Sequence, residues 1–167
     1  MMLTEDGNVY TWGRDDDSQL GRGQGLSLDS YAIDYTPLPI ELPEGEKVKK
    51  MAAGYGSAAI VCESGNIYWW GMKLHLSPYQ EIIMKKFDGE ENARLLKVKE
   101  VSCGGHMVDA ITEDGLLYTW GDARKQPYGI PNHHAVSATE VKILSDAGIV
   151  YNVAAGQSMV LAAVELH

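Results

Sequence analysis

Few side chains in this sequence have the types and spacing that could do chemistry. Asp15, Asp16 and Asp17 are consecutive and follow a strand-like run, so they could bind a cation or a basic partner. His133 and His134 are adjacent, and adjacent side chains on an extended chain point to opposite sides, which does not suit two ligands of one metal ion. We expect a solvated turn at the aspartates, an exposed loop at the histidines, and no metal site.

The sequence also lacks the loops that bind phosphate or present a nucleophile. The 18 glycines do not form a G-x-x-x-x-G-K-[ST] loop, and GYGSAA, residues 54–59, does not have the G-x-S-x-G spacing. Cys62 and Cys103 lie in apolar runs without a C-x-x-C pattern, which is typical of buried free thiols in a reducing compartment. We therefore expect no catalytic residue, no cofactor and no enzymatic activity.

The composition limits the partners of this chain. Of 167 residues, 45% are hydrophobic and 22% are charged, as in ordinary globular proteins. The net charge of −9 disfavours binding to nucleic acid and to acidic membranes, because both carry negative charge. The start of the chain turns polar after three residues, so we expect no signal peptide and an intracellular protein, cytoplasmic or nuclear.

The elements that position these residues come from an internal repeat. LTEDGNVYTWG, residues 3–13, returns as ITEDGLLYTWG, residues 111–121, with eight of eleven positions identical. A third copy, CESGNIYWWG, occupies residues 62–71. The separations between the tryptophans of successive copies are 58 and 50 residues, the tryptophans being Trp12, Trp70 and Trp120.

A second repeated block has nearly the same period. It reads KVKKMAAGYGSAAIV at 47–61, KVKEVSCGGHMVDAI at 97–111 and IVYNVAAGQSMVLAA at 149–163. A shared period of 50 to 58 residues indicates a repeat architecture, and propeller blades have periods near this range. The central glycines of this block are Gly54, Gly104 and Gly156.

Each repeat reads as four short strands. Asp114-Gly115 separates two strand-like runs, and an Asp-Gly pair in that place predicts a hairpin turn. Further strand-like runs lie at 36–42 and 138–144. We expect Trp69 to pack rather than to bind a ligand. Glycine would let strands approach closely and tryptophan would pack between sheets, which assigns structural roles to Gly7, Trp12, Gly54, Gly65, Trp70, Gly104, Gly115, Trp120 and Gly156.

The best copy, residues 104–121, resembles the regulator of chromosome condensation repeat, whose pattern is Gly-x-x-x-x-x-Ala-x-Thr-Glu-Asp-Gly-x-aliphatic-Tyr-x-Trp-Gly. The first copy adds WGRDDDSQLG, residues 12–21, which is similar to the Trp-Gly-x-Asn-x-x-Gly-Gln-Leu-Gly tail of that family. The resemblance covers almost the whole chain. It implies an all-β fold, a β-propeller that is usually seven-bladed, of which this chain holds about three blades.

The sequence departs from the family pattern in two respects. A recurrent histidine, three residues after the strand-ending glycine, is replaced here by Ser57, Met107 and Met159. An insertion also occupies residues 73–97. The Ser77-Pro78 pair suits the start of a helix and the apolar residues Ile82, Ile83 and Phe87 recur at roughly helical spacing, which predicts a short helix over 78–87.

The repeats divide one domain of residues 1–167 into parts. Residues 1–46 are expected to form a partial blade, 47–96 a blade with the helical insertion, 97–148 a blade, and 149–167 a partial blade that completes another. Three blades are too few for a closed ring. Either two copies share blades across a two-fold axis and give six, or the chain is an open arc of a larger protein, such as a multidomain ligase or exchange factor.

A propeller is a rigid scaffold whose function lies in its loops. We expect a protein-interaction scaffold in which loops 14–35, 73–97 and 122–137 build a contact surface on one face. The resemblance implies an alternative, guanine-nucleotide exchange on a small GTPase of the Ran type. A similar plant ultraviolet-B photoreceptor needs a tryptophan–arginine cluster that these four tryptophans do not supply. The expected partner is another protein, a small GTPase or a ubiquitin-ligase component, besides a second copy of the chain. The candidate contact residues are Arg14, Asp15, Asp16, Asp17, Tyr79, Lys85, Lys86, Arg124, His133 and His134.

Overall fold

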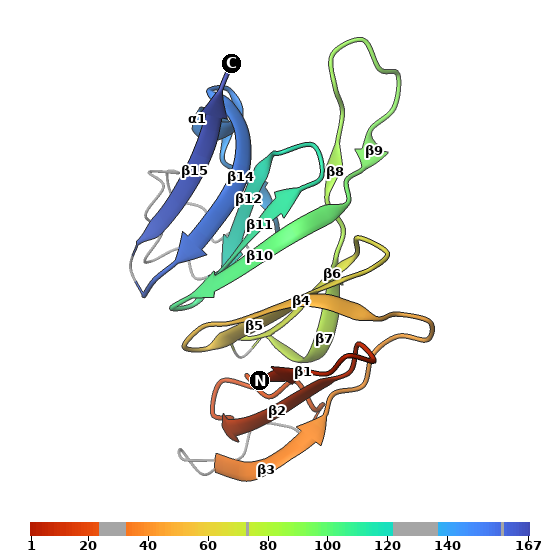
Figure 1. Cartoon of the computed structure of the whole chain (residues 1–167), viewed down its shortest axis with the longest axis vertical. Coiled ribbons are helices and arrows are strands. Elements are labelled where there is room, and N and C mark those ends of the chain that lie inside the picture. The colour runs from red at the N-terminus through yellow and green to blue at the C-terminus, as the bar shows by residue number, and fades with distance from the viewer. Residues whose placement is uncertain (24–32, 73, 122–136, 158) are drawn as a thin grey trace.

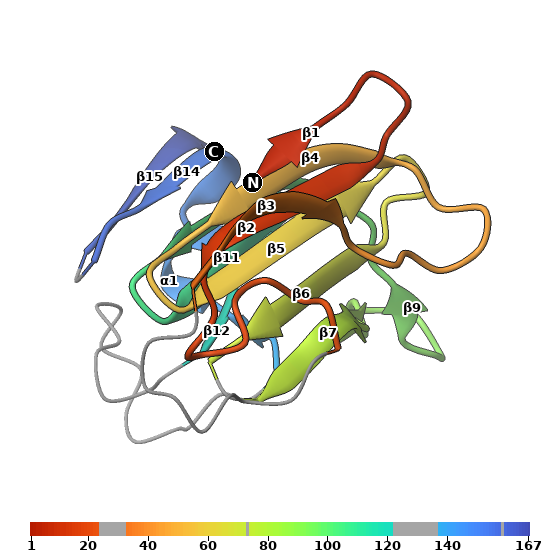
Figure 2. The same cartoon turned by 90° about the horizontal axis from the view of Figure 1, so that it is seen from below.

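A computed structural model describes residues 1–23, 33–72, 74–121, 137–157 and 159–167 of the chain. Its strands form small antiparallel sheets that follow one another along the chain and stack face to face (Figure 1). Figure 2 shows the stack from below, with the first sheet in front of the second. The predicted all-β architecture of small repeated sheets is confirmed.

Four of these sheets are successive units of the repeat, and we call them blade 1, blade 2, blade 3 and half-blade 4. Blade 1 contains β1 (Met2–Leu3), β2 (Val9–Arg14) and β3 (Ile33–Pro39). Blade 2 contains β4 (Val48–Ala53), β5 (Ser57–Cys62), β6 (Ile67–Gly71) and β7 (His75–Glu81). Blade 3 contains β10 (Val98–Gly104), β11 (Met107–Thr112), β12 (Leu117–Gly121) and β13 (Thr139–Glu140). Half-blade 4 contains β14 (Gly148–Ala155) and β15 (Val160–Leu166).

The remaining elements lie in the connections between blades. A two-stranded hairpin of β8 (Met84–Lys85) and β9 (Arg94–Leu95) joins blade 2 to blade 3. The α-helix in the described part of the chain is α1 (Lys142–Ser145), which precedes half-blade 4. No helix among the described residues is long and apolar enough to cross a bilayer.

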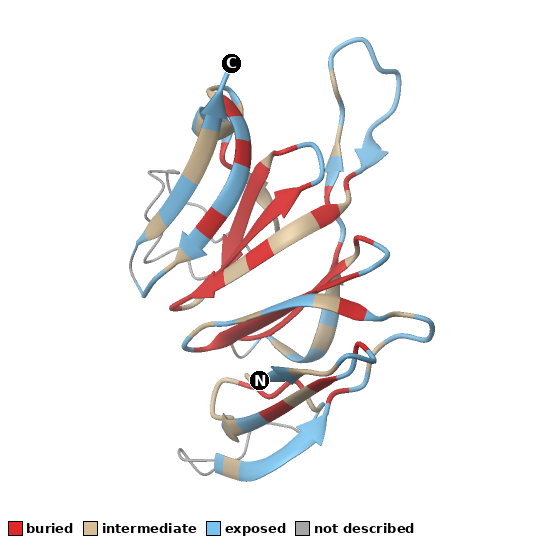
Figure 3. Cartoon of the chain, viewed as in Figure 1, coloured by how far each residue is buried: buried red, intermediate tan, exposed pale blue. Residues whose placement is uncertain are grey.

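Apolar layers between the sheets hold the stack together. Trp70 lies in the layer between blades 1 and 2, while Trp69 and Trp120 meet in the layer between blades 2 and 3 with ring centroids 6.3 Å apart. A third layer joins blade 3 to β14 through Val150 and Val153. Trp69, Trp70 and Trp120 are all fully buried, which confirms the packing role predicted for Trp69. Figure 3 shows this burial concentrated in the middle sheets.

Trp12 differs from its two counterparts because 41% of its surface is exposed. Trp70 and Trp120 each face the preceding blade. Trp12 occupies the same place in blade 1, and none of the described blades packs on that side of its ring. The expectation that Trp12 packs like the other two is therefore not met within residues 1–167.

The turns between the second and third strands tie each blade to the next. Gly7, Gly65 and Gly115 occupy these turns with φ of 82°, 80° and 80°, values that favour glycine. Each glycine carbonyl accepts a hydrogen bond from the first strand of the following blade, from Val48 N at 3.1 Å, Val98 N at 2.9 Å and Val150 N at 2.9 Å. The repeated hairpin turn is thus also a repeated contact between blades.

The helix predicted over 78–87 is wrong. Residues up to Glu81 belong to β7, the outer strand of blade 2, whose strand partner in the described part of the chain is β6. Pro78 is tolerated there because an edge strand has an unpaired side that needs no N–H donor. Ile83 and Phe87 pack against the apolar layer between blades 2 and 3. Their spacing in the sequence is therefore set by contacts with that layer and does not indicate the apolar face of a helix.

The fourth strands also differ from their predicted limits. The run at 36–42 forms a strand that starts earlier and ends earlier, at Ile33–Pro39. The run at 138–144 contains only the two-residue strand Thr139–Glu140, and α1 follows it directly. The outer strand of blade 3 is therefore shorter than the outer strand of blade 2.

The connections lie on two opposite ends of the blades. Because strands alternate in direction, the turns after first strands and the loops after third strands lie at the same end of each blade. We call this end the turn face. The turns between second and third strands described above lie at the opposite end. Residues 82–97 follow the fourth strand β7 and therefore lie at the other end, where the hairpin β8–β9 projects (Figure 1). The expectation that loops 14–35, 73–97 and 122–137 form one face is wrong for 82–97.

Candidate partner-binding surface

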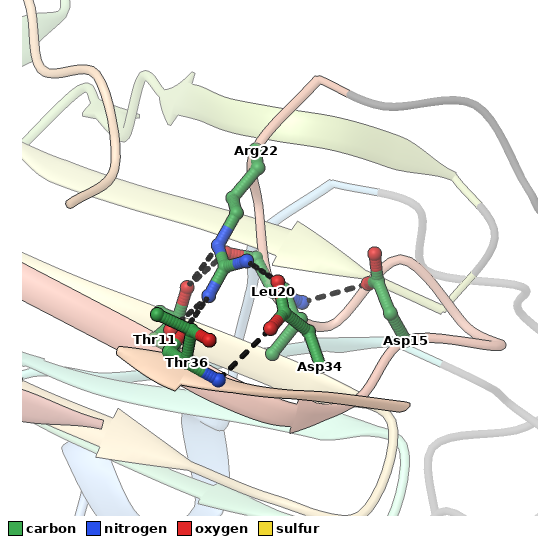
Figure 4. Close-up of polar contacts among 6 residues, drawn as sticks. All are labelled: Thr11, Asp15, Leu20, Arg22, Asp34 and Thr36. Atoms are coloured by element: carbon green, nitrogen blue, oxygen red, sulfur yellow. Dashed lines mark hydrogen bonds and ion pairs between the residues drawn. The ribbon is translucent and has the colours of Figure 1, made fainter. Parts of the chain in front are cut away.

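Arg22 anchors the loop that follows β2 on the turn face. Its side chain is only 7% exposed and points back to the sheet, as Figure 4 shows. The guanidinium donates to Thr11 Oγ1 at 3.3 Å, to the Thr36 carbonyl oxygen at 3.1 Å, to the Thr11 carbonyl oxygen and to the Asp34 carboxylate. A planar group with several donors suits such a set of acceptors. Arg22 thus joins β2, β3 and the loop between them.

Two of the three predicted aspartates hold this loop through side-chain hydrogen bonds. Asp15 Oδ1 accepts from Leu20 N at 3.0 Å, and burial raises the pKa of Asp15. Asp16 binds the Arg14 guanidinium and accepts from Gln19 Nε2 at 3.2 Å. Burial alone would raise the pKa of Asp16, but these hydrogen bonds outweigh it and lower that pKa. The described residues contain no group of acids, histidines and cysteines that could hold a metal ion.

Three exposed or half-exposed side chains from different blades meet on the turn face. Arg14 of blade 1 donates to the Tyr55 hydroxyl of blade 2 at 2.7 Å and lies 5.3 Å from the centre of its ring. The Tyr55 ring meets His106 of blade 3 edge-on, with centroids 5.5 Å apart. Tyr55 itself is 56% exposed. We call Arg14, Tyr55 and His106 the rim row.

A pocket of about 360 Å³ adjoins the rim row at the open edge of blade 1. Its walls come from the first turn of blade 2, including Gly54, Tyr55 and Ser57, and from Trp12 and Arg14 of β2. The corresponding space beside Gly156 is filled by Gly104 of the preceding blade, since a Cβ atom on Gly104 would lie 2.1 Å from the carbonyl oxygen of Gly156. The pocket therefore lies between β2 and its loop on one side and the first turn of blade 2 on the other.

Three other predicted contact residues, Tyr79, Lys85 and Lys86, lie in β7 and around β8, away from the rim row. Tyr79 lies on strand β7, where it stacks on His75 with centroids 4.1 Å apart and remains half exposed. Lys85 and Lys86 lie at the opposite end, and Lys85 donates to Glu140 Oε1 at 2.5 Å. Arg124, His133 and His134 lie outside the described residues.

Both thiols are buried and free. Burial, with the nearby Glu46 carboxylate, raises the pKa of Cys62 to about 12. Burial and the charge of Asp109 also raise the pKa of Cys103. Because the thiolate is the reactive form, neither side chain is poised for nucleophilic chemistry.

The comparisons with known proteins agree with this arrangement. Residues 6–61 match the family model described as the regulator of chromosome condensation (RCC1) repeat. The chain is 27% identical to the Arabidopsis thaliana RCC1 domain-containing protein RUG3, mitochondrial, over 86% of this chain and 31% of that protein. It is 30% identical to the human E3 ubiquitin-protein ligase HERC2 over 98% of this chain and 3% of that protein. The chain belongs to the RCC1 repeat family.

Solved structures of this family extend the match to the fold. The chain superimposes on Prp20p of Saccharomyces cerevisiae with a TM-score of 0.78 at 19% identity, covering 99% of this chain and 41% of that chain. Human WBSCR16 gives a TM-score of 0.73 at 20% identity, over 98% of this chain and 42% of that chain. The predicted partial RCC1 propeller of about three blades is confirmed. The chain spans less than half of each of these proteins.

The sequence reasoning missed Tyr55, His106 and Arg22. Tyr55 and His106 lie within the repeated AAGYGS and SCGGHM segments, at non-glycine positions of otherwise glycine-rich turns. A large side chain in such a turn could have been predicted to lie at the surface. Arg22 follows the QLG tail of the repeat, and nothing in the sequence pattern distinguishes it from a solvated arginine.

Proposed function

We propose that this RCC1-repeat chain is a rigid scaffold that binds another protein through its turn face, centred on the rim row. The observation that carries the proposal is the contact of Arg14, Tyr55 and His106 across three blades. Tyrosine and arginine are enriched among residues that dominate binding energy. Tyr55 is exposed yet held on both sides, so little side-chain freedom is lost when a partner covers it.

The charge of the chain supports a partner with a basic surface. The net charge is −9, and Asp16 and Asp17 lie in the loop beside Arg14. Complementary charge accelerates encounter and is screened by salt. Association through this face should therefore slow as the ionic strength rises, while the apolar contacts of Tyr55 keep part of the affinity.

Nucleotide exchange on a small GTPase of the Ran type is the second candidate. It is supported by the match to Prp20p, a structure whose description names binding to Gsp1p and histones, and by a 29% identity to Protein RCC1 of Candida albicans over 73% of this chain. Exchange needs no covalent chemistry, which fits the absence of a reactive thiol or metal cluster among the described residues. A cytoplasmic or nuclear location belongs to this proposal, although RUG3 is described as mitochondrial.

Affinity capture with matched variants tests the scaffold proposal. Tyr55→Ala should lower the affinity of a captured partner roughly tenfold or more. Ile82→Ala removes an exposed apolar side chain at the opposite end and should leave capture unchanged. No protein above background, or equal loss with both variants, would contradict the proposal. Release of labelled nucleotide from Ran, stimulated by the chain, would instead favour exchange.

A further inference from the structure

The outer strand of blade 2 presents a hydroxyl side chain in the middle of a bulge. The ladder between β6 and β7 pairs Trp69 with Tyr79 and then Gly71 with His75, so three residues of β7 face a single residue of β6. A bulge at a sheet edge interrupts the ladder and changes the direction of the side chains that it carries. Ser77 is the middle residue of this bulge and is exposed. Its hydroxyl has no hydrogen-bond partner among the described residues.

The residue after Ser77 is a proline. Pro78 has no N–H group, and a residue that precedes proline is held in an extended conformation. The strand partner of β7 in the described part of the chain is β6, so the outer side of β7 is a strand edge. Such an edge can be bound by another protein along its extended backbone. An extended segment in which proline follows a serine hydroxyl is the substrate form that a proline-directed protein kinase accepts.

The same place in the neighbouring blades offers two comparisons. In blade 1 the ladder between β2 and β3 has an equal bulge between Asp34 and Leu38, and its middle residue is Thr36, which also precedes a proline. In blade 3 the equivalent residue is Ser137, which is exposed but precedes an alanine. The repeat therefore places three hydroxyl groups at one position, two of them before proline.

The backbone of Thr36 is held by side chains on both sides. Its amide donates to Asp34 Oδ1 at 2.9 Å, and its carbonyl oxygen accepts from Arg22 Nη2 at 3.1 Å. The side-chain hydrogen bonds of the described residues include none to the backbone of Ser77. A kinase that draws the acceptor residue into its active site would thus break side-chain contacts at Thr36 but not at Ser77. The structure distinguishes two dipeptides that look alike in the sequence.

The surroundings of Ser77 can accommodate a phosphoryl group. A pocket of about 410 Å³ adjoins Ser77, and its walls include Arg22 and Glu41. The guanidinium of Arg22 donates four hydrogen bonds to described residues, which leaves one of its five N–H groups for a phosphate oxygen. Glu41 is exposed, so solvent and salt weaken its repulsion of a phosphate.

We propose that Ser77 is the phosphoacceptor of a proline-directed serine/threonine kinase. Ser77 Oγ attacks the γ-phosphorus of ATP bound to the kinase, the new O–P bond forms, and the bond to the bridging oxygen breaks so that ADP leaves. The hydroxyl proton passes to the catalytic base of the kinase. The product carries a charge of about −1.5 to −2 at neutral pH. This charge lies beside the contact between blades 1 and 2 at which Gly23 N donates to the Leu76 carbonyl oxygen over 2.8 Å.

Labelling of the native chain tests this proposal. The chain is incubated with a purified proline-directed kinase and labelled ATP, and the modified residues are mapped by mass spectrometry. Ser77→Ala should remove most of the label, and Pro78→Ala should do the same although the hydroxyl remains. Thr36→Ala and Ser137→Ala should each leave most of the label in place. An unlabelled native chain overturns the proposal, as does a loss with Thr36→Ala that equals the loss with Ser77→Ala.

A synthetic peptide separates the sequence motif from its presentation by the fold. The peptide LHLSPYQEI, residues 74–82, should be labelled at its serine by the same kinase. Label in the peptide but not in the native chain overturns the proposal, because β7 then withholds Ser77, and label in neither also overturns it. Ser77→Ala removes an exposed side chain that makes no described hydrogen bond, so its circular dichroism and melting temperature should match those of the wild type. Loss of label in that variant then reports the loss of the acceptor.

Discussion

The amide of Val98 donates a hydrogen bond to the carbonyl oxygen of Gly65 over 2.9 Å, and this contact fastens blade 2 to blade 3. A Cβ atom on Gly65 would lie 2.7 Å from Cβ of Lys97, the residue next to Val98. The turn glycine therefore meets two demands at once, a left-handed backbone and a close approach to the following blade. The same pair of demands recurs at Gly7 and Gly115.

Gly65→Ala should consequently destabilise the chain by about 1–3 kcal/mol. A φ of 80° strains the backbone of an alanine at this position. The added methyl group also presses on Lys97, and this contact pushes blade 3 away from blade 2. Urea unfolding followed by circular dichroism measures the loss. Gly89→Ala is the matched control, since Gly89 has a φ of 85° but no heavy atom within 4 Å of its added Cβ. Equal losses for the two variants would contradict a role of close blade contact.

Arg22→Lys should lower the free energy of unfolding by about 1.5–3 kcal/mol, although it keeps the charge. A lysine ammonium cannot reach the Thr11 and Thr36 carbonyl oxygens and Asp34 together, so some of these acceptors, including the buried Thr11, lose their donors. Arg94→Lys is the control, because Arg94 is half exposed and its contacts with Glu90 and Asp114 are 3.8 and 3.6 Å long. That variant should change stability by less than about 0.5 kcal/mol. Equal effects would mean that the planar guanidinium of Arg22 is unimportant.

The repeat made most of the fold predictable from the sequence. Local signals such as Asp114-Gly115 mark a turn wherever they occur, and the structure has a φ of 80° at Gly115. The helix at 78–87 failed because the spacing of Ile83 and Phe87 is set by an adjacent blade, which a helical pattern imitates. Local sequence patterns therefore predict an element correctly where backbone preferences determine it, and they predict it wrongly where packing against a neighbouring sheet determines it.

The rim row shows that surface clusters, too, are hard to predict from local sequence. Arg14, Tyr55 and His106 are far apart in sequence, and only the stacking of three blades brings their side chains together. Trp12 carries the same signal as Trp70, but its exposure depends on whether another blade lies before it. Neither property is encoded within one repeat, so neither could be predicted from one.

Glu46 should make the stability of the chain depend on acid. Its carboxylate accepts from Asn66 Nδ2 at 2.6 Å, Ser64 Oγ at 2.7 Å and the Tyr68 hydroxyl at 3.1 Å. Burial opposes its ionisation, but these donors prevail and hold the pKa of Glu46 below its ordinary value of 4.5. Because the folded-state pKa is lowered, the stabilisation is present above the unfolded-state pKa and is lost as the pH falls through the folded-state pKa.

Glu46→Gln tests this dependence on pH. The free energy of unfolding of the wild type should fall between about pH 5 and pH 3, and the variant should fall less steeply over that range. Glu44→Gln, at an exposed position of the same connection, serves as the control and should keep the wild-type slope. A Glu46→Gln slope equal to that of the wild type would show that the three donors do not favour the carboxylate.

The two native thiols should resist modification as long as the sheets remain stacked. Cys62 is fully buried and its pKa is raised to about 12, so its thiolate fraction at neutral pH is on the order of a thousandfold below that of a free cysteine. A thiol-specific disulfide reagent should react with the native chain correspondingly slowly, and with both thiols promptly after denaturation. Ser77→Cys places a thiol at an exposed position of β7 and should react at the rate of a free thiol. Rapid reaction of the native wild type would mean that the layers around Cys62 and Cys103 open readily, since burial is the main cause that raises both pKa values.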